Sequence, residues 1–301
     1  MYWVIAAALV VAWLLLEMKT SRPDGDLLRV HPVRRILLFL MPTRAESIVF
    51  FDAAVDATRL EAFLASPAAG GAHITHVTVA AANIALAATP KMNRFVAGGR
   101  LYQRRGRHLS FSMKRARMDR EAAISTVKLE MHDGETFAEL KARVDGGVKE
   151  ERSGKKTRTD KEIDIFNALP RPVLRFGVRL FRWLDDHNLL PHAFIHGDPL
   201  YTSIFLANLG SLGMGAGYHH LFEYGSCPLF IMIGQVERRA VVVDGEVVVR
   251  PILPVRFTYD ERIEDGLNAR FGIDRLVAIL TDPEPTLASG PMWPRPEAAS
   301  A

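Results

Sequence analysis

Residues 255–287 read VRFTYDERIEDGLNARFGIDRLVAILTDPEPTL, and they contain the clearest structural signals of the chain. An apolar run from Ile252 to Tyr259 has the character of a β-strand and ends in a charged turn. A helical pattern then begins at Asp265, and Asp282-Pro283 stops it. The apolar positions of one helix face are Leu267, Phe271, Leu276 and residues 279–280. A strand that delivers charged side chains into a tight turn before a helix often presents catalytic groups, so residues 260–266 are the candidate site.

The turn carries a recognisable motif, which reads Asp260-Glu261-Arg262-Ile263-Glu264-Asp265-Gly266. It resembles the active-site signature of the 2-oxoacid dehydrogenase acyltransferases (dihydrolipoyl acyltransferases), whose catalytic domain belongs to the chloramphenicol acetyltransferase-like superfamily. Three other segments resemble that family: Asn208-Leu209-Gly210, the hairpin at residues 241–251, and Asp282-Pro283-Glu284. The resemblance runs from about residue 34 to residue 287 and is strongest in its last third. The chain is identified as a divergent member.

This resemblance implies both a fold and an assembly. The expected fold is α/β, a two-layer chloramphenicol acetyltransferase-like sandwich with a largely antiparallel mixed sheet. The expected assembly is a homotrimer or a multiple of three, with the active-site cleft between subunits. In the family, a histidine removes a proton from a thiol or hydroxyl that attacks an acyl-coenzyme A thioester. A serine or threonine hydroxyl donates to the developing oxyanion, and an Asp or Asn helps to hold the turn.

The chain departs from the family at both reacting positions. Glu261 stands where the family has its histidine, and Ala207, just before Asn208, stands where the family has its hydroxyl. Alanine cannot donate a hydrogen bond, and glutamate works as a base only when burial raises its pKa. Asp265 and the other family residues of the turn are kept. The two substitutions therefore remove the reacting groups but not the residues that shape the turn.

Two functions remain open from these residues. The first is an oligomeric, catalytically degenerate protein that acts as a scaffold or binding protein. The alternative is an active acyl-coenzyme A-dependent acyltransferase with Glu261 as its base, acting on a membrane-associated acceptor. Coenzyme A is the expected cofactor only in the alternative. A further candidate base, His220, lies in the His219-His220 pair, which superficially resembles the motif of the acetyltransferase branch.

Composition narrows the class of protein. Of 301 residues, 49% are hydrophobic, and the net charge of +4 is far from that of a nucleic-acid-binding protein. A single cysteine, Cys227, excludes an internal disulfide. The pairs His73/His76 and His192/His196 have helical spacing but no third ligand nearby in sequence, so no metal site is expected.

The N-terminal segment predicts a membrane anchor. Residues 2–16 are uninterruptedly apolar, with Tyr2, Trp3 and Trp13 suited to the membrane interfaces. Lys19 and other basic residues follow the run, which predicts a single-pass anchor in an inner or cytoplasmic membrane with the body on the cytoplasmic side. As a helix, the run would span only about 22 Å of a core that is about 30 Å thick, so a buried N-terminal helix stays open as an alternative.

Residues 170–184 contain a second candidate membrane surface. Arginines recur at helical spacing among apolar and aromatic side chains, as expected of a helix that lies on anionic lipid. The alternative is a core helix with an exposed arginine edge. Two interpretations also remain open for residues 30–41: an amphipathic helix on the membrane surface, or a segment packed on the domain. The predicted membrane-facing residues here are Arg171, Arg175, Arg179, Arg182 and Trp183.

The predicted organisation therefore has four parts: an anchor helix at 1–18, a linker at 19–33, the acyltransferase-like domain at 34–287 and a disordered tail at 288–301.

Overall fold

A computed structural model describes the whole chain except residues 117–118, 120, 123, 154–165, 167 and 294–301. Its main element is a seven-stranded sheet in the order β2-β10-β8-β7-β5-β6, with β9 paired to the N-terminal part of β10. The neighbours β8/β7 and β7/β5 are parallel, and the other pairs are antiparallel. In the order of the sheet, the strands are β2 (Ile48–Asp56), β10 (Glu246–Asp260), β8 (Leu229–Ile233), β7 (Ile204–Asn208), β5 (Arg107–Lys114), β6 (Ile124–Met131) and β9 (Glu237–Val243).

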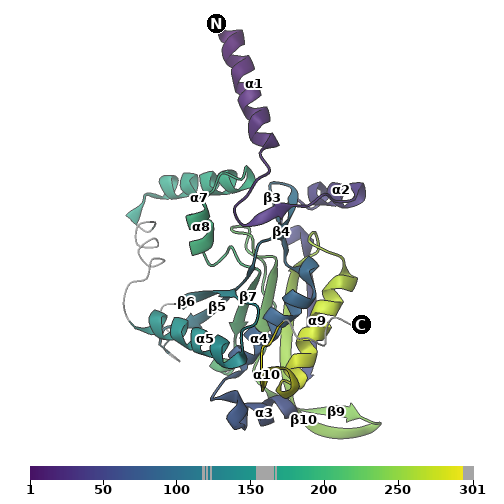
Figure 1. The fold of residues 1–301 in the computed structure, drawn as a ribbon. Coiled ribbons are helices and arrows are strands. Elements are labelled where there is room, and N and C mark those ends of the chain that lie inside the picture. Colours follow the sequence, from purple (N-terminus) through teal and green to yellow (C-terminus); the bar gives the residue numbers. More distant parts are fainter. Residues whose placement is uncertain (117–118, 120, 123, 154–165, 167, 294–301) are drawn as a thin grey trace.

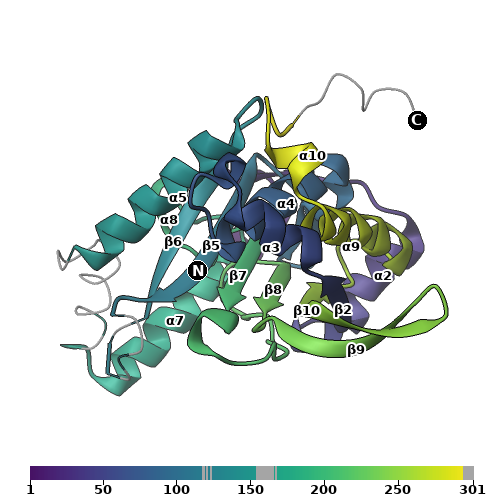
Figure 2. The same cartoon turned by 90° about the horizontal axis from the view of Figure 1, so that it is seen from below.

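Helices cover one face of this sheet (Figures 1 and 2). The central helix α4 is buried on almost every side, because its many alanines let neighbouring backbones approach. Large side chains such as Leu140, Leu206 and Leu253 fill the space between helices and sheet. The predicted α/β fold with a mixed, largely antiparallel sheet is confirmed. The covering helices are α3 (Thr58–Ala65), α4 (Ile74–Ala88), α5 (Phe137–Arg152), α9 (Gly266–Thr281) and α10 (Glu284–Leu287).

A smaller sheet and four helices lie at one end of the molecule (Figure 1). The smaller sheet has the order β1-β4-β3 and is antiparallel. Its strands are β1 (Gly25–Leu27), β3 (Arg94–Ala97) and β4 (Arg100–Arg104). The helices of this end are α1 (Tyr2–Met18), α2 (Pro32–Leu40), α7 (Arg171–Asp186) and α8 (His192–Gly197). Short 3-10 turns occur at Ala45–Ser47, Pro67–Ala69, Pro90–Met92 and Gly210–Leu212.

The helix α1 projects away from the body, and none of its residues is buried (Figure 1). It has 17 residues. Among the described residues, no helix combines the length and the apolar character needed to cross a bilayer. The predicted membrane-spanning anchor is therefore not supported, because the helix ends before its length reaches that of the hydrocarbon core. The alternative of a buried N-terminal helix is wrong, since the side chains of α1 are exposed.

The structure departs from the predicted linker and tail. The linker range contains β1, and within the same range Arg22 and Asp24 form buried ion pairs, so this part belongs to the folded body. In the tail range, Met292 is buried and its backbone N–H donates to the Glu135 carbonyl at 2.9 Å. Residues 288–293 are thus held on the body, and the rest of the predicted tail lies outside the described residues.

Candidate functional site

The turn after β10 is built around a buried ion pair. Asp260, the last residue of β10, accepts from Arg262 at 2.8 Å (Nε) and 2.7 Å (Nη2). Both side chains are almost fully buried. The remaining Nη1 of Arg262 donates to the Met41 carbonyl at 2.9 Å, just beyond α2. A short-range pair of this kind closes the chain on itself and fixes the shape of the turn.

A second buried carboxylate joins the turn to two distant elements. Glu264 accepts from Arg34 of α2 at 3.1 Å and from Arg94 of β3 at 2.5 Å. Burial lowers the pKa of Arg94, and the neighbouring Glu264 carboxylate opposes that shift. Arg34 also donates to the Arg262 carbonyl at 3.2 Å. The sequence motif gave no signal for this role of Glu264, because both of its partners are distant in sequence.

Asp265 acts as the N-cap of α9. Its Oδ1 accepts from the backbone N–H of Asn268 at 3.0 Å and from the side-chain amide of the same residue at 3.1 Å. The backbone hydrogen bond from Asn268 lowers the pKa of Asp265. A charged cap at the positive end of a helix is a structural arrangement, so Asp265 stabilises the start of α9.

Glu261 points to solvent from the middle of this turn. Its backbone N–H donates to the Ser47 carbonyl at 2.9 Å, which ties the turn to the start of β2. The side chain is exposed, and no hydrogen bond or ion pair to it is found among the described residues. A carboxylate that serves as a general base near neutral pH is usually enclosed in an apolar pocket. Glu261 has no such enclosure within this chain.

Ala207 and Asn208 lie at the end of β7. Ala207 is buried in a small apolar cluster with Phe205 and Met232, and its methyl group presents no donor. Asn208 donates from its amide to Thr75 Oγ1 at 3.0 Å and accepts from the Ser211 backbone N–H at 3.0 Å. Asn208 therefore links β7 to α4 and to the Gly210 turn.

Strand register shows that Glu261 and Ala207 do not meet within one chain. Ala207 is level with Met232 of β8, which in turn is level with Arg256 of β10. Glu261 lies five residues beyond Arg256 in sequence, which is about 16 Å along the strand direction. A site that used both positions would need a second subunit.

His219 and His220 occupy a loop beside the same strands. The His219 ring stacks on Phe230 with centroids 4.1 Å apart, and its Nδ1 lies 2.6 Å from the His220 carbonyl oxygen. The His219 carbonyl accepts from the Thr258 hydroxyl at 2.6 Å. These contacts give His219 a structural role, and His220 is exposed.

Two cavities flank the turn. One is apolar, measures about 50 Å³ and is lined by Tyr259, Phe257 and side chains of α4 and α9. The other is polar, measures about 420 Å³ and lies between the turn, α2, α7 and the base of α1. Its wall includes the buried Arg44, which donates to the carbonyls of Phe222 and Gly225, both at 2.8 Å.

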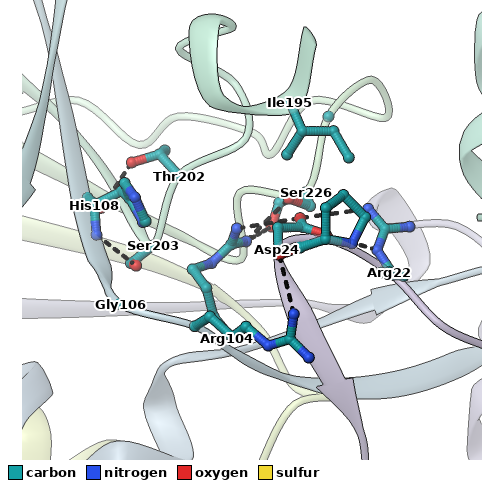
Figure 3. Close-up of polar contacts among 12 residues, drawn as sticks. Arg22, Asp24, Arg104, Gly106, His108, Ile195, Thr202, Ser203 and Ser226 are labelled. Carbon is teal, nitrogen blue, oxygen red and sulfur yellow. Dashed lines mark hydrogen bonds and ion pairs between the residues drawn. The ribbon is translucent and has the colours of Figure 1, made fainter. Parts of the chain in front are cut away.

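A buried polar cluster joins residues 22–24 to β4 and to Ser226 (Figure 3). Asp24 sits between Arg22 at 2.9 Å and Arg104 at 3.7 Å. Burial by itself would raise the pKa of Asp24, but the two guanidinium groups lower it below its usual range. Arg22 also pairs with Asp185 at the end of α7 at 2.9 Å. Arg104 donates to the hydroxyl and the carbonyl of Ser226 at 3.0 and 2.8 Å.

The histidine pairs have structural partners. His76 Nε2 lies 3.0 Å from an Asp145 carboxylate oxygen, and burial lowers the pKa of His76 in spite of that partner. The rings of His192 and His196 stack with centroids 5.5 Å apart. Within the part of the chain that the structure describes, no three His, Cys, Asp or Glu side chains are grouped to hold a metal ion.

Known proteins match the C-terminal part of this chain. Residues 201–288 match the family model of the 2-oxoacid dehydrogenases acyltransferase (catalytic domain). This part of the chain is therefore similar in sequence to that catalytic domain. A curated relative, the dihydrolipoyllysine-residue acetyltransferase component of the pyruvate dehydrogenase complex of Bacillus subtilis (strain 168), is 29% identical over 83 residues. That match covers 28% of this chain and only 18% of the relative. The predicted resemblance is confirmed.

Solved structures of these acyltransferases have the same fold. The cubic core of the pyruvate dehydrogenase multienzyme complex matches with a TM-score of 0.55 and 16% identity, covering 88% of this chain and 93% of that one. Dihydrolipoamide acetyltransferase of Azotobacter vinelandii matches with 0.54 and 17%, with the same coverage. A chloramphenicol acetyltransferase matches with 0.50 and 12%, covering 85% and 99%.

Proposed function

We propose that this protein is a catalytically degenerate acyltransferase-fold protein that acts as a membrane-associated scaffold or binding protein. The observation that carries the proposal is the pair of side chains at the two reacting positions. Ala207 offers a buried methyl group in place of a hydroxyl, and Glu261 offers an exposed carboxylate in place of an imidazole.

The expected loss of reaction rate follows from the two missing groups. The related Azotobacter vinelandii acetyltransferase is described by a mechanism that involves a serine, a histidine and an asparagine. By motif resemblance, the corresponding positions here are Ala207, Glu261 and Asp265. Removing one oxyanion donor costs on the order of 10²–10³ in rate, and a positioned general base contributes roughly 10²–10⁴. The loss of both would leave turnover near background.

What remains of the site is its framework. The buried Asp260–Arg262 pair and the Asp265 cap keep the turn in shape without any reacting group. The buried methyl of Ala207 is packed rather than left as a gap. The turn keeps its shape although it buries several charged side chains. This fits a cleft that serves as a binding or scaffolding site and does not catalyse a reaction.

Self-association in threes is the second part of the proposal. One related structure is described as a cubic core, and we expect a homotrimer or a multiple of three here. The β9–β10 hairpin extends beyond the sheet (Figure 2) and exposes Val242, Val247 and Val249. Exposed valines on a projecting hairpin suit a contact between copies of the chain. The separation of Glu261 from Ala207 within one chain also fits a cleft shared by two subunits.

Membrane association is the third part. The exposed apolar residues of α1 include Tyr2, Trp3 and Trp13. Large apolar side chains gathered on an exposed surface are typical of a site that binds a membrane or another protein. Lys19 and Arg29 follow α1, so we place the body on the cytoplasmic side of an inner or cytoplasmic membrane. Arg22 is buried on Asp24 and does not contribute to this argument.

An acyl-transfer assay tests the degenerate site. Purified full-length protein is incubated with acetyl-, succinyl- or longer acyl-coenzyme A and dihydrolipoamide, and the release of free coenzyme A is measured. We expect no release above the protein-free background, either for the wild type or for Glu261→Ala. Robust release that disappears in Glu261→Ala and persists in Glu61→Ala, a control at an exposed glutamate of α3, would overturn the proposal.

A further inference from the structure

Two helices at the α1 end of the molecule present apolar side chains to solvent. In α2, the residues Val33, Ile36, Leu37 and Leu40 follow the spacing i, i+3, i+4, i+7 and are 39–69% exposed. The opposite side of α2 faces the body, where Leu38 is buried and Arg34 pairs with Glu264. An amphipathic helix in a water-soluble domain turns its apolar stripe toward the core. The orientation of α2 is reversed.

The helix α7 has an exposed apolar stripe as well. Of its residues only Asp185 is buried. Exposed apolar residues occur at i, i+3, i+7 and i+10, which places them along one stripe of the helix: Val173, Phe176, Leu180 and Trp183. The arginines recur at i, i+4, i+8 and i+11, along a second stripe: Arg171, Arg175, Arg179 and Arg182. Apolar and cationic side chains on one helix are typical of contact with an anionic lipid surface.

The three helices are arranged as one surface. Figure 1 shows α7 and α2 running across the root of α1, one on each side, while α1 points away from the body. Buried polar contacts fix this arrangement at the root. Asn188, just after α7, donates to the carbonyl of Lys19 at the end of α1 at 2.8 Å, and Arg22 binds Asp185 of α7 at 2.9 Å. The Arg34–Glu264 pair holds α2 on the other side.

We propose that α1, α2 and α7 form one lipid-docking face, in which α1 enters an anionic bilayer and α2 and α7 lie in its headgroup layer. The inference rests on the proposed membrane association and adds the orientation of the body and the lipid charge. The face consists of the exposed residues of α1, of Val33, Ile36, Leu37 and Leu40, and of the two stripes of α7.

Charge favours lipid over a second copy of the chain. A twofold contact, in which this face of one copy meets the same face of another, would bring the two arginine stripes of α7 close together, and like charges repel. Each basic side chain near an anionic membrane surface instead contributes attraction. The acidic residues of this region are already engaged. Glu17 pairs with Arg100 at 3.4 Å, and Asp186 accepts from the Gly98 backbone N–H at 3.3 Å.

Binding of the full-length protein to lipid vesicles tests this face, with a fluorescent label placed at one chosen residue at a time. A fluorescent reporter is attached at Ile36→Cys or Phe176→Cys, with Ile124→Cys on an exposed strand position as the matched control. The native Cys227 is buried and does not compete for the label. With phosphatidylcholine vesicles that contain phosphatidylglycerol, we expect a blue shift at positions 36 and 176 and none at 124. Wild-type protein is floated with the same vesicles in parallel.

A charge-reversed variant completes the test. Arg175→Glu/Arg179→Glu should weaken binding to the anionic vesicles at least tenfold, by about fivefold for each cation removed. Arg270→Glu on the exposed side of α9 should leave binding unchanged. If wild-type protein floats but positions 36 and 176 show no shift, α1 alone docks and the face is wrong. If wild-type protein does not float at all, the proposed membrane association fails as well. If the arginine variant changes the sedimentation coefficient but not flotation, the face binds a second copy.

Discussion

The Arg34 guanidinium and the Glu264 carboxylate lie 3.1 Å apart and join the helix α2 to the turn that follows β10. Glu264 is also bound by Arg94, so one buried carboxylate holds two cations that come from different parts of the chain. Glu264 therefore links α2, which is part of the proposed lipid-docking face, to the candidate site, and the contact of Arg262 with the Met41 carbonyl adds a second link.

Glu264→Ala should destabilise the protein by about 3 kcal/mol, because it leaves two partly buried guanidinium groups facing each other without a counter-charge. The free energy of unfolding measured by urea titration would show the loss. The control is Glu237→Ala, which removes one partner of an exposed ion pair with Arg239 and should cost less than about 1 kcal/mol. Equal losses in the two variants would contradict the role assigned to Glu264.

The exposed valines of the β9–β10 hairpin predict a contact between subunits. Val247→Glu places a charge in the middle of that contact, and we expect sedimentation to show a shift from the oligomer toward the monomer. The monomer should keep the circular dichroism spectrum of the wild type, because Val247 is 72% exposed. Ile124→Glu makes the same chemical change at another exposed position and should leave the oligomer intact.

The strand, turn and helix of residues 252–281 could be predicted because each signal is local. One short segment contains the apolar run of β10, the Asp265 cap and the Asp282-Pro283 helix stop. The motif at residues 260–266 predicts the turn between the strand and the helix. The Glu261 position followed from the same motif, and the Ala207 position followed from the Asn208-Leu209-Gly210 segment. Their separation within one chain could not, since it depends on the register of three strands.

Long-range charge pairs were the main feature that the sequence concealed. Residues 19–33 have the composition of a linker, yet Arg22 binds Asp185, which is 163 residues away in sequence. Composition predicts that charged residues stay in water, and only a folded structure shows which of them find partners. The outward stripe of α2 was concealed for a related reason. The spacing of its apolar residues predicts an apolar face but not whether that face packs on the core. The ion pair between Arg34 and Glu264 turns the Arg34 side of α2 toward the body, so the apolar stripe stays exposed.

Gly210 marks a close approach of two backbones. A Cβ atom at this position would lie 2.3 Å from the Gly234 carbonyl oxygen, which belongs to the backbone and cannot move aside. Gly210→Ala should therefore destabilise the protein by about 2 kcal/mol or more through a forced backbone shift. Gly217→Ala is the control, since a Cβ there meets no atom within 4 Å. Thermal unfolding should separate the variants, and an unchanged midpoint in Gly210→Ala would refute the close approach.

His108 should make the protein less stable as the pH falls. Burial, and then the nearby Arg104 and Lys128 cations, lower the pKa of His108 to about 3, whereas an unfolded chain titrates near 6.5. Below about pH 6.5 the unfolded state therefore binds a proton that the folded state does not. The free energy of unfolding falls by up to about 1.4 kcal/mol per pH unit on this account, from about pH 6.5 down to about pH 3, and is unaffected at higher pH.

His108→Gln removes this titration, so its unfolding free energy should fall less steeply than that of the wild type between pH 6.5 and pH 4. Urea titrations at several pH values give both slopes. The difference between variant and wild type cancels the carboxylates that titrate in the same range, so parallel curves for His108→Gln and the wild type would show that His108 takes up its proton in the folded state.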